Sequence, residues 1–388
     1  MSNDTQPEIR FPGFTEDWEQ RKLGDISDKV TEKNKENEFS ETLTNSAEYG
    51  IINQRDFFDK DISNEKNLNG YYIVRPDDFV YNPRISNSAP VGPVKRNKLE
   101  RTGVMSPLYY VFRVHDVDKT FLEKYFSANG WHKFMKLNGD SGARSDRFAI
   151  KDSVFREMPI PVPSELEQRH IGLFLDKLDT TITLHQRKLD LLKETKKGFL
   201  QKMFPKNGAK VPEIRFPGFT EDWEERKLGE ISRMYQPLTI TGNDVLPDGV
   251  PVFGANGFIG FFSEANHIED QVTISARGEG TGTPSYVHGP VWITGNSMVV
   301  NVDDFDINKY FLFANLTANS LKKYVTGGAQ PQLTRDVLVK VPITLPNADE
   351  QQKISSFFQQ LDNTITLHQR KLDLLKETKK GFLQKMFV

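Results

Sequence analysis

The sequence predicts an α+β protein in which two globular domains of mixed α/β structure are joined by two long antiparallel helices that form a coiled coil. Three observations support this. Two long segments recur almost unchanged in the 388-residue chain. One of them carries an apolar heptad pattern, which is typical of a coiled coil. The regions between the repeats alternate β-like runs with short helical stretches, as in α+β modules. Because every part occurs twice, the sequence also predicts pseudo-twofold symmetry.

The repeats define the order of the domains. PEIRFPGFTEDWEQRKLGDIS starts at Pro7 and returns from Pro212 with only two differences. DTTITLHQRKLDLLKETKKGFLQKMF starts at Asp179 and returns from Asp362 with a single difference. The chain is therefore a head, a variable region and a helix, followed by the same three parts again. We expect two domains and two spacer helices, in the order 1–163, 164–206, 207–346 and 347–388.

Composition excludes several classes of protein. The chain has no cysteine, which excludes disulfide frameworks, thiolate metal sites and cysteine nucleophiles. Its seven histidines show no metal-ligand spacing. No apolar run reaches about 18 residues and the N-terminus lacks an apolar segment, so we expect a cytoplasmic protein without a membrane span or secretory signal. The net charge of −2 argues against general coating of nucleic acid, although local basic loops remain compatible with it.

The two helical segments are expected to pair with each other. Each begins at a capping box, Ser164–Glu167 in the first copy and Asn347–Glu350 in the second. Downstream, apolar residues recur at spacings of four and three over about five heptads, which is the seam of a coiled coil. The residues predicted to pair the helices are Ile171, Leu175, Leu178, Ile182, Leu189, Leu192, Ile354, Phe358, Leu361, Ile365, Leu372 and Leu375.

His185 and Lys196 occupy the remaining positions of the first seam. We interpret them as residues that set the register or extend toward solvent, and not as ligands. A core stripe in a helical bundle is the alternative interpretation of the seam. Pairing within the chain is the simplest solution, because each helix needs a partner and a near-identical copy is present. A pseudo-twofold axis across such a pair requires antiparallel helices.

The two variable regions share a skeleton although their sequences look unrelated. In each, a β-like run lies between an Asp and an Arg, Asp77 and Arg84 in the first region and Asp270 and Arg277 in the second. Further along, KYF at residues 124–126 and 309–311 is expected to open a helix. A polar glycine loop follows in each region, at 141–147 and 327–335, and a short apolar strand with prolines then leads into the long helix.

The loops carry side chains that suit nucleic acid. Arg matches the guanine edge in a bidentate manner, Asn and Gln match adenine, and Thr and backbone N–H groups match phosphate. Each of these residues is also normal on a solvated turn, and salt bridges from Asp77 and Asp270 to Arg84 and Arg277 are an equal alternative. The predicted DNA-binding residues are Arg84, Asn87, Lys95, Arg96, Lys98, Arg101, Arg144, Arg147, Arg277, Thr281, Thr283, Gln330, Gln332, Thr334 and Arg335.

No catalytic site is evident in the sequence. Arg277–Thr283 is glycine-rich but lacks the Gly-Lys-Ser/Thr ending of a P-loop. Tyr81–Arg84 matches only part of the Asn-Pro-Pro-aromatic motif of amino-methyltransferases, and no cofactor glycine motif accompanies it. We therefore expect a non-catalytic protein. A coiled-coil adaptor that binds protein partners through its variable domains is the alternative, but it gives no reason for two Arg-bearing glycine loops.

The repeats also support a resemblance that covers essentially the whole chain. RFPGFTEDWE with KLG(D/E)IS, the PxP-(S/N)-x-x-E-Q start of each long helix, and the repeated LHQRKLDLLKETKKGFLQKMF resemble the specificity (S) subunit of type I restriction–modification enzymes. The resemblance implies two target-recognition domains that each read one half of a bipartite, double-stranded DNA target, with spacer helices that set the gap between the halves.

The same resemblance implies partners. Two modification (methyltransferase) subunits are expected to bind the S subunit, and restriction (helicase/nuclease) subunits to join that core. S-adenosylmethionine, ATP and Mg²⁺ are expected on the partner subunits and none in this chain. The base-reading residues have no fixed family motif, so the resemblance assigns none of them.

Overall fold

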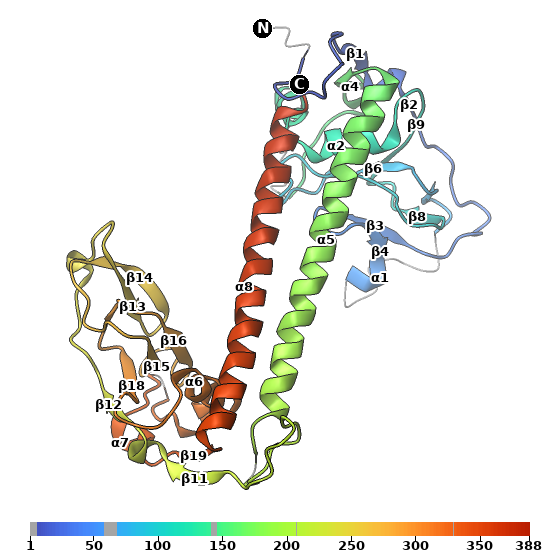
Figure 1. Cartoon of the computed structure of the whole chain (residues 1–388). Coiled ribbons are helices and arrows are strands. Elements are labelled where there is room, and N and C mark those ends of the chain that lie inside the picture. The colour runs from blue at the N-terminus through green and yellow to red at the C-terminus, as the bar shows by residue number, and fades with distance from the viewer. Residues whose placement is uncertain (1–5, 58–67, 141–145, 207, 329) are drawn as a thin grey trace. The chain divides into compact units, whose positions relative to one another are not determined.

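The computed structural model describes residues 6–57, 68–140, 146–206, 208–328 and 330–388. The chain divides into two compact units, unit 1 with residues 1–185 and 371–388 and unit 2 with residues 186–370 (Figure 1). Each unit contains one globular domain of strands and short helices together with part of both long helices. The predicted α+β architecture of two domains and two long helices is therefore confirmed.

Each unit is built on a four-stranded antiparallel sheet. In unit 1 the strand order is β2-β9-β6-β7, and in unit 2 it is β12-β18-β15-β16. The unit 1 strands are β2 (Ser27–Lys29), β6 (Phe79–Tyr81), β7 (Val94–Arg96) and β9 (Tyr110–Val114). The unit 2 strands are β12 (Arg233–Tyr235), β15 (Gln271–Ser275), β16 (Pro284–Val287) and β18 (Ser297–Asn301). Counted along the chain, the order is first, fourth, second, third in both sheets. The two variable regions thus share a sheet topology despite their dissimilar sequences.

Smaller sheets complete each domain. The head of each repeat pairs with the strand that precedes the long helix, β1 with β10 in unit 1 and β11 with β19 in unit 2. An antiparallel hairpin, β3–β4 or β13–β14, precedes the second strand of each main sheet. The bounds of these strands are β1 (Glu19–Lys22), β3 (Leu43–Ser46), β4 (Gly50–Asn53), β10 (Pro159–Val162), β11 (Glu224–Lys227), β13 (Val250–Gly254), β14 (Gly257–Phe262) and β19 (Pro342–Leu345). The remaining strands are β5 (Tyr72–Val74), β8 (Gly103–Met105) and β17 (Trp292–Ile293).

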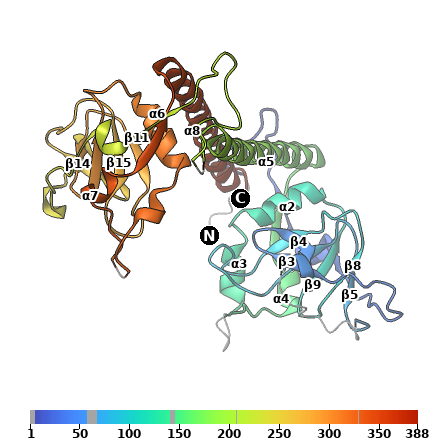
Figure 2. The same ribbon diagram turned by 90° about the horizontal axis from the view of Figure 1, so that it is seen from below.

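One helix of each domain lies between its sheet and the long helices, α2 (Lys119–Ser127) in unit 1 and α6 (Lys309–Ala318) in unit 2 (Figure 2). Asp118 and Asn308 cap these helices by accepting the backbone N–H groups of Phe121 and Phe311. The expectation that a helix opens at Lys124 is wrong, because the Asp118 cap starts α2 earlier and Lys124 lies inside it. The shorter helices are α1 (Gln54–Phe57), α3 (His132–Asn138), α4 (Asp152–Arg156) and α7 (Arg335–Leu338).

The long helices are α5 (Glu165–Lys202) and α8 (Ala348–Lys385). Only half of each predicted capping box forms in the expected way. The backbone N–H of Glu350 donates to Asn347 at 2.9 Å, but the Glu350 carboxylate is buried and takes two hydrogen bonds of 2.7 Å from Arg215. Glu167 and Arg10 repeat this bidentate pair in unit 1. The Glu side chain therefore anchors the head segment to the start of the long helix, a charge-assisted contact that satisfies a buried carboxylate.

The two helices are antiparallel within each unit. In unit 1 Phe174 packs against Phe382 with ring centroids 4.9 Å apart, and in unit 2 Phe199 packs against Phe357 at 5.0 Å. All predicted pairing residues are buried or half-buried, and the pattern is the same in the two copies. The seam position Lys196 forms an ion pair of 2.6 Å with Asp362 of the opposite helix. This agrees with its interpretation as a residue that sets the register.

The core of each domain is closed by the end of a helix that begins in the other repeat. Met386 and Phe387 at the end of α8 belong to the core of unit 1. Met203 and Phe204 at the end of α5 belong to the core of unit 2. The start of the other long helix enters the same core, with Ile171 and Leu175 in unit 1 and Ile354 and Phe358 in unit 2. Both helices are therefore needed to complete either core.

Within the described residues, every helix is too short or too polar to cross a lipid bilayer.

The core closure can be tested with a matched pair of substitutions. Phe387→Ala removes a ring centred 5.6 Å from Phe121, and Phe204→Ala removes its counterpart 5.8 Å from Phe311. Each change should lower the free energy of unfolding by about 3–5 kcal/mol, because it leaves a cavity in a core. Hydrogen exchange should show the loss of protection in unit 1 for Phe387→Ala and in unit 2 for Phe204→Ala. Equal loss in both units from either variant would contradict this assignment.

Candidate nucleic-acid interface

In unit 1 the structure brings Arg84 next to Arg147, which is far from it in sequence. The two residues form an isolated antiparallel bridge, flanked by backbone hydrogen bonds from Ile85 to Asp146 (3.0 Å) and from Phe148 to Pro83 (2.8 Å). Phe148 is buried and fixes the bridge to the core. The loop after β6 and the end of the glycine loop therefore present their arginines together.

A groove of about 560 Å³ opens at this bridge. Arg84 and Arg147 line it together with one carboxylate, Glu48, and with hydroxyl and amide side chains from the β3–β4 hairpin and the neighbouring loops. Among these are Thr44, Asn45, Ser46, Asn82, Ser86, Ser88 and Ser106. Asn87 is exposed on the loop that forms one side. Guanidinium groups combined with short polar side chains provide donors and acceptors for base edges and phosphates.

Unit 2 has the same arrangement at the equivalent place. Arg277 bridges Gln332, and the N–H of Leu333 donates to the carbonyl of Ala276 at 3.0 Å. This bond corresponds to the one from Phe148 to Pro83 in unit 1. A groove of about 420 Å³ lies there, lined by Arg277, Gly278, Glu279, Gln330, Pro331 and Gln332. The two domains thus present an Arg and a second polar residue at the same junction of two loops.

Glycine and threonine hold the two loops of unit 2 in place. Gly327 has a φ of +84°, and a Cβ there would lie 2.5 Å from the carbonyl oxygen of Gln330, so the turn that presents Gln330 requires glycine. Thr281 is buried and its hydroxyl donates to the carbonyls of Gly278 (2.6 Å) and Pro331 (3.1 Å). The Thr281 side chain therefore joins the two loops. Its hydroxyl is used inside the fold and is not presented to DNA as the sequence predicted.

The arginines at the two bridges are not held by the aspartates that the sequence offered as partners. Asp77 pairs with Lys119 at 2.9 Å and Arg96 at 3.5 Å, and Asp270 accepts from His288 and from the N–H of Gly289 at 3.1 Å each. Within the described parts of the chain, no carboxylate forms an ion pair with Arg84 or Arg277. The salt-bridge alternative for these two arginines is therefore wrong, and both side chains are exposed.

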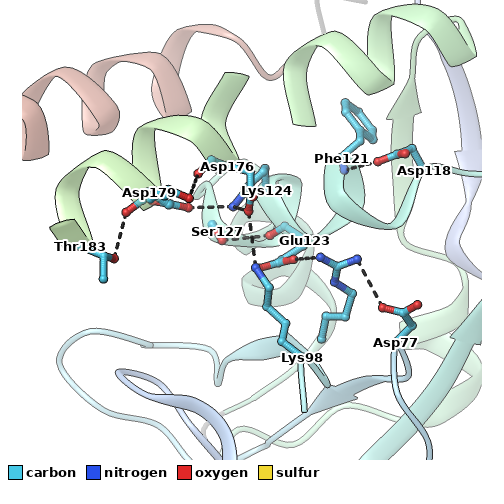
Figure 3. A network of polar contacts seen from close by, with 12 residues as sticks. Asp77, Lys98, Asp118, Phe121, Glu123, Lys124, Ser127, Asp176, Asp179 and Thr183 are labelled. Atoms are coloured by element: carbon cyan, nitrogen blue, oxygen red, sulfur yellow. Dashed lines mark hydrogen bonds and ion pairs between the residues drawn. The ribbon is translucent and has the colours of Figure 1, made fainter. Parts of the chain in front are cut away.

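Three of the predicted cations of unit 1 lie against α2 and the long helices instead of the groove. Arg96 pairs with Glu123 at 2.7 Å, and Lys98 pairs with Glu123 at 3.2 Å and with Asp176 of α5 at 3.5 Å (Figure 3). Burial lowers the pKa of Lys95, and the nearby ammonium of Lys379 in α8 adds to this effect. The basic cluster of the sequence is split because Arg96 in β7 and Lys98 just after it pair with carboxylates from distant segments.

The other predicted residues lie in several settings. Arg101 forms a bidentate pair with Glu41 at 2.7 and 2.8 Å. Arg335 donates to the carbonyl of Met234 at 3.0 Å, which attaches α7 to β12. Thr283 and Thr334 are exposed beside the unit 2 loops. Arg144 lies outside the described residues. Together with the groove residues above, this leaves two sets of polar residues at the bridges. They are the exposed Arg84 and Asn87 with the half-buried Arg147 in unit 1, and the exposed Arg277, Gln330 and Gln332 in unit 2.

A second polar centre, which sequence reasoning missed, connects each domain to the long helices. Asp179 of α5 accepts from Lys124 of α2 at 2.7 Å (Figure 3). It also accepts from Lys379 of α8 at 2.5 Å. Its repeat partner Asp362 accepts from the hydroxyl of Tyr310 in α6 at 2.5 Å and from Lys196 at 2.6 Å. One carboxylate of the repeat thus binds both the opposite helix and the adjacent domain.

The electrostatics of this centre favour the charged forms. Burial alone would raise the pKa of Asp179, but hydrogen bonds and charge from Lys124 and Lys379 lower it on balance. Burial would likewise lower the pKa of Lys124, whose side chain is 2% exposed, yet its bond to Asp179 raises that pKa. Lys124 and Tyr310 both lie in the KYF segments of the variable regions, but the sequence matched Lys124 to Lys309 and gave neither residue a contact with the long helices. Among the described residues no group of His, Asp and Glu is arranged to hold a metal ion.

Comparison with known proteins assigns a family to this arrangement. The family model of the type I restriction modification DNA specificity domain matches residues 15–194 and 220–377, one match in each repeat. The chain belongs to the type I restriction–modification DNA specificity family. Each matched segment contains one of the two Arg-bearing grooves.

Individual relatives agree with the specificity family. The EcoprrI specificity subunit of Escherichia coli is 30% identical over 159 residues, which cover 38% of this chain and 39% of that protein. The MjaVIII specificity subunit of Methanocaldococcus jannaschii is 24% identical over 270 residues, 60% of this chain and 62% of that protein. The alignments therefore span less than two thirds of these curated relatives. The S subunit structure from M. genitalium is 15% identical and matches 99% of both chains with a TM-score of 0.67, which shows a shared fold.

The contacts of Asp179 that attach the domain of unit 1 to the long helices should weaken at acid pH. Because the folded-state pKa of Asp179 is lowered, its stabilising effect is present above the pKa of an unfolded Asp, about 3.9, and is lost as the pH falls through the folded value. Asp179→Asn should therefore destabilise unit 1 at neutral pH, and the difference from wild type should shrink as the pH falls below about 4. Urea unfolding at several pH values measures this.

Asp28→Asn is the control, because Asp28 is an exposed carboxylate of the same unit. It should leave the free energy of unfolding nearly unchanged across the range. A difference between Asp179→Asn and wild type that stays constant down to acid pH would contradict the ion-pair assignment.

Proposed function

We propose that the chain is the sequence-reading subunit of a type I restriction–modification complex, and that each unit reads one half of a bipartite double-stranded DNA target. The observation that carries this proposal is the repeated junction of two loops, with Arg84 and Arg147 in one domain and Arg277 and Gln332 in the other. The two domains share a sheet topology but present different side chains at the same junction. Reading two different half-targets requires such an arrangement. The family match supports the same conclusion.

The chemistry of the junctions suits readout of bases. An arginine can donate two hydrogen bonds to the O6 and N7 atoms of guanine, and a glutamine can bond the N6 and N7 atoms of adenine. Arg84 and Arg277 are exposed and free of carboxylate partners in the described structure, so binding to DNA does not require breaking an ion pair. Gln330 and Gln332 add amide groups beside Arg277. The cations that are paired within the fold are left out of the proposed reading set.

Much of the attraction to the phosphate backbone would come from partner subunits. The chain has 51 basic and 53 acidic residues, so its net charge gives little general attraction to DNA. Several basic side chains are also neutralised internally, as Arg96, Lys98 and Arg101 are. In this proposal the chain contacts the bases and thereby specifies the sequence, and the modification subunits contact the phosphates.

The long helices supply a surface for those partners. Leu184 and Leu191 of α5 are 58% and 61% exposed, and their repeat counterparts Leu367 and Leu374 of α8 are 64% and 67% exposed. In each helix the two leucines are seven residues apart, so they fall on one side of it, outside the buried seam. Exposed apolar residues on an otherwise polar helix face indicate a binding site for another protein. We assign this face to the modification subunits, with the restriction subunits joining through them.

The proposed role is non-catalytic. Methyl transfer with S-adenosylmethionine, and cleavage with ATP and Mg²⁺, would occur on the modification and restriction subunits. Such a complex acts on DNA in the cytoplasm, which agrees with the location expected from the sequence.

The reading proposal predicts a local change of specificity. Arg277→Ala should weaken binding of the S–modification complex to its target by about 1–3 kcal/mol and relax the base preference at one position of one half-target, because one bidentate contact is lost. Arg84→Ala should do the same in the other half. Sequencing of methylated sites in a host that expresses each complex measures both effects.

Lys340→Ala is the matched control, since Lys340 is another exposed cation of unit 2. It should leave the base preference unchanged. A uniform loss of affinity with an unchanged target in Arg277→Ala and Arg84→Ala would reject base reading at the two junctions.

The docking proposal predicts a loss of assembly. Leu184→Glu or Leu367→Glu should weaken co-purification of modification subunits by at least tenfold, because each places a charge in a buried apolar contact. Thr180→Glu introduces the same charge at an exposed outer position of α5 and should have little effect. Normal assembly of both leucine variants would show that the modification subunits bind elsewhere.

A further inference from the structure

The hairpin that precedes each Arg-bearing loop is fastened to that loop in the same way in both units. In unit 1 the amide of Asn82 donates to the carbonyl oxygen of Asn45 at 2.8 Å. In unit 2 the hydroxyl of Ser275 donates to the carbonyl oxygen of Ala255 at 2.5 Å. Asn82 and Ser275 each stand two residues before the Arg. In both domains, therefore, one end of a hairpin, β3–β4 or β13–β14, lies beside the loop that begins at Arg84 or Arg277. We call this loop the reading loop.

In unit 2 the turn of the β13–β14 hairpin also lies close to Gly280, further along the loop. A Cβ on Gly280 would lie 3.4 Å from the side-chain oxygen of Asn256 and 3.9 Å from the carbonyl oxygen of Ala255. Gly280 belongs to the loop that begins at Arg277, and Asn256 lies in the turn of the β13–β14 hairpin. The first residues of β14 thus follow directly after a point of contact with the reading loop.

These residues of β14 are large, apolar and exposed. Phe258 is 54% exposed and Ile259 is 49% exposed. Phe258 packs its ring between Phe253 and Phe261, with centroids 6.0 and 5.2 Å away, so it is held in place although it faces solvent. The hairpin of unit 1 exposes Tyr49 to 62% in its own turn. An ordered, exposed aromatic residue in a hairpin whose turn lies against the Arg277 loop indicates a contact with another molecule.

The residue types of the β13–β14 hairpin limit which group of the DNA it can contact. Residues 250–262 contain no charged side chain, so this hairpin cannot bind phosphate through a cation. Double-stranded DNA offers one apolar group in the major groove, the 5-methyl group of thymine, which phenylalanine and other apolar side chains contact. A hairpin next to an Arg that bonds a base edge would meet the neighbouring base pair.

We infer that Phe258 and Ile259 are specificity-determining residues that contact a thymine methyl group next to the base pair read by Arg277. This inference rests on the proposed function and extends it to a second element of the reading surface. It adds an apolar contact to the hydrogen bonds of Arg277, Gln330 and Gln332, and it gives the β13–β14 hairpin a role in selecting A·T pairs.

The test removes single methyl groups from the DNA. The complex of the chain with modification subunits is titrated with duplexes in which each thymine of the half-target read by unit 2, and of its two flanking base pairs, is replaced in turn by deoxyuridine. One replacement should weaken binding by wild type about fourfold, the effect of one buried methyl group. Phe258→Ala/Ile259→Ala should bind the unmodified target more weakly and should no longer distinguish thymine from deoxyuridine at that position.

Ile268→Ala is the matched control, because Ile268 is also apolar and 70% exposed but precedes β15 at the end opposite Arg277. This variant should keep the wild-type response to deoxyuridine. Thermal unfolding of the hairpin variant should match wild type, which separates a lost contact from a lost fold.

The inference is overturned if wild type binds its target with no sensitivity to any of these thymine methyl groups, or if the hairpin variant keeps the sensitivity. A rise in 2-aminopurine fluorescence on wild-type binding, absent in the variant, would also overturn it, because it would indicate insertion between bases instead of a methyl contact. Absence of any sequence-specific binding by the wild-type complex would instead reject the proposed function itself.

Discussion

Every part of this protein depends on the two long helices lying antiparallel, because neither globular core is complete without both of them. Helix α5 begins in the core of unit 1 with Ile171 and Leu175 and ends in the core of unit 2 with Met203 and Phe204. Helix α8 does the reverse. Each domain therefore buries apolar residues from a helix start of its own repeat and a helix end of the other repeat. The hydrophobic effect, which is roughly proportional to the apolar area removed from water, therefore makes each core depend on apolar residues from both repeats.

The repeated residues form the contacts that fix each domain to the long helices, and the variable residues of each domain bind to these same positions. The Glu167–Arg10 and Glu350–Arg215 pairs fix each head to its helix, and every one of these residues lies in a repeated position. At Asp179 and Asp362 the repeated carboxylate stays the same while the domain offers Lys124 in one case and Tyr310 in the other. A carboxylate accepts hydrogen bonds from an ammonium and from a phenol alike. The frame can therefore carry domains of different sequence without a change in the helices.

The distribution of charge fits the proposed reading of DNA without general coating of it. Cations that face the helices are neutralised by Glu123, Asp176 and Asp179, which maintains the fold and removes them from long-range attraction. Arg84 and Arg277 keep their guanidinium groups at the surface, at the same junction of two loops in each unit. The nearly neutral chain thus combines internally paired cations with the exposed arginines of the two bridges.

The sequence by itself determined the organisation: two heads, two variable regions and two long helices, with a seam from Ile171 onward that the structure places at buried and half-buried positions. These features follow from local periodicity and repetition, which are visible in one dimension. It also singled out Arg84 and Arg277 through their matched position after a β-like run. Only the tertiary structure decided which loop residues stand together and which are used within the fold. Arg96 and Arg101 look like members of a basic patch in the sequence, but their partners Glu123 and Glu41 are supplied by distant segments. The pairing of Arg84 with Arg147 and of Arg277 with Gln332 likewise depends on contacts between chain segments that no local pattern encodes.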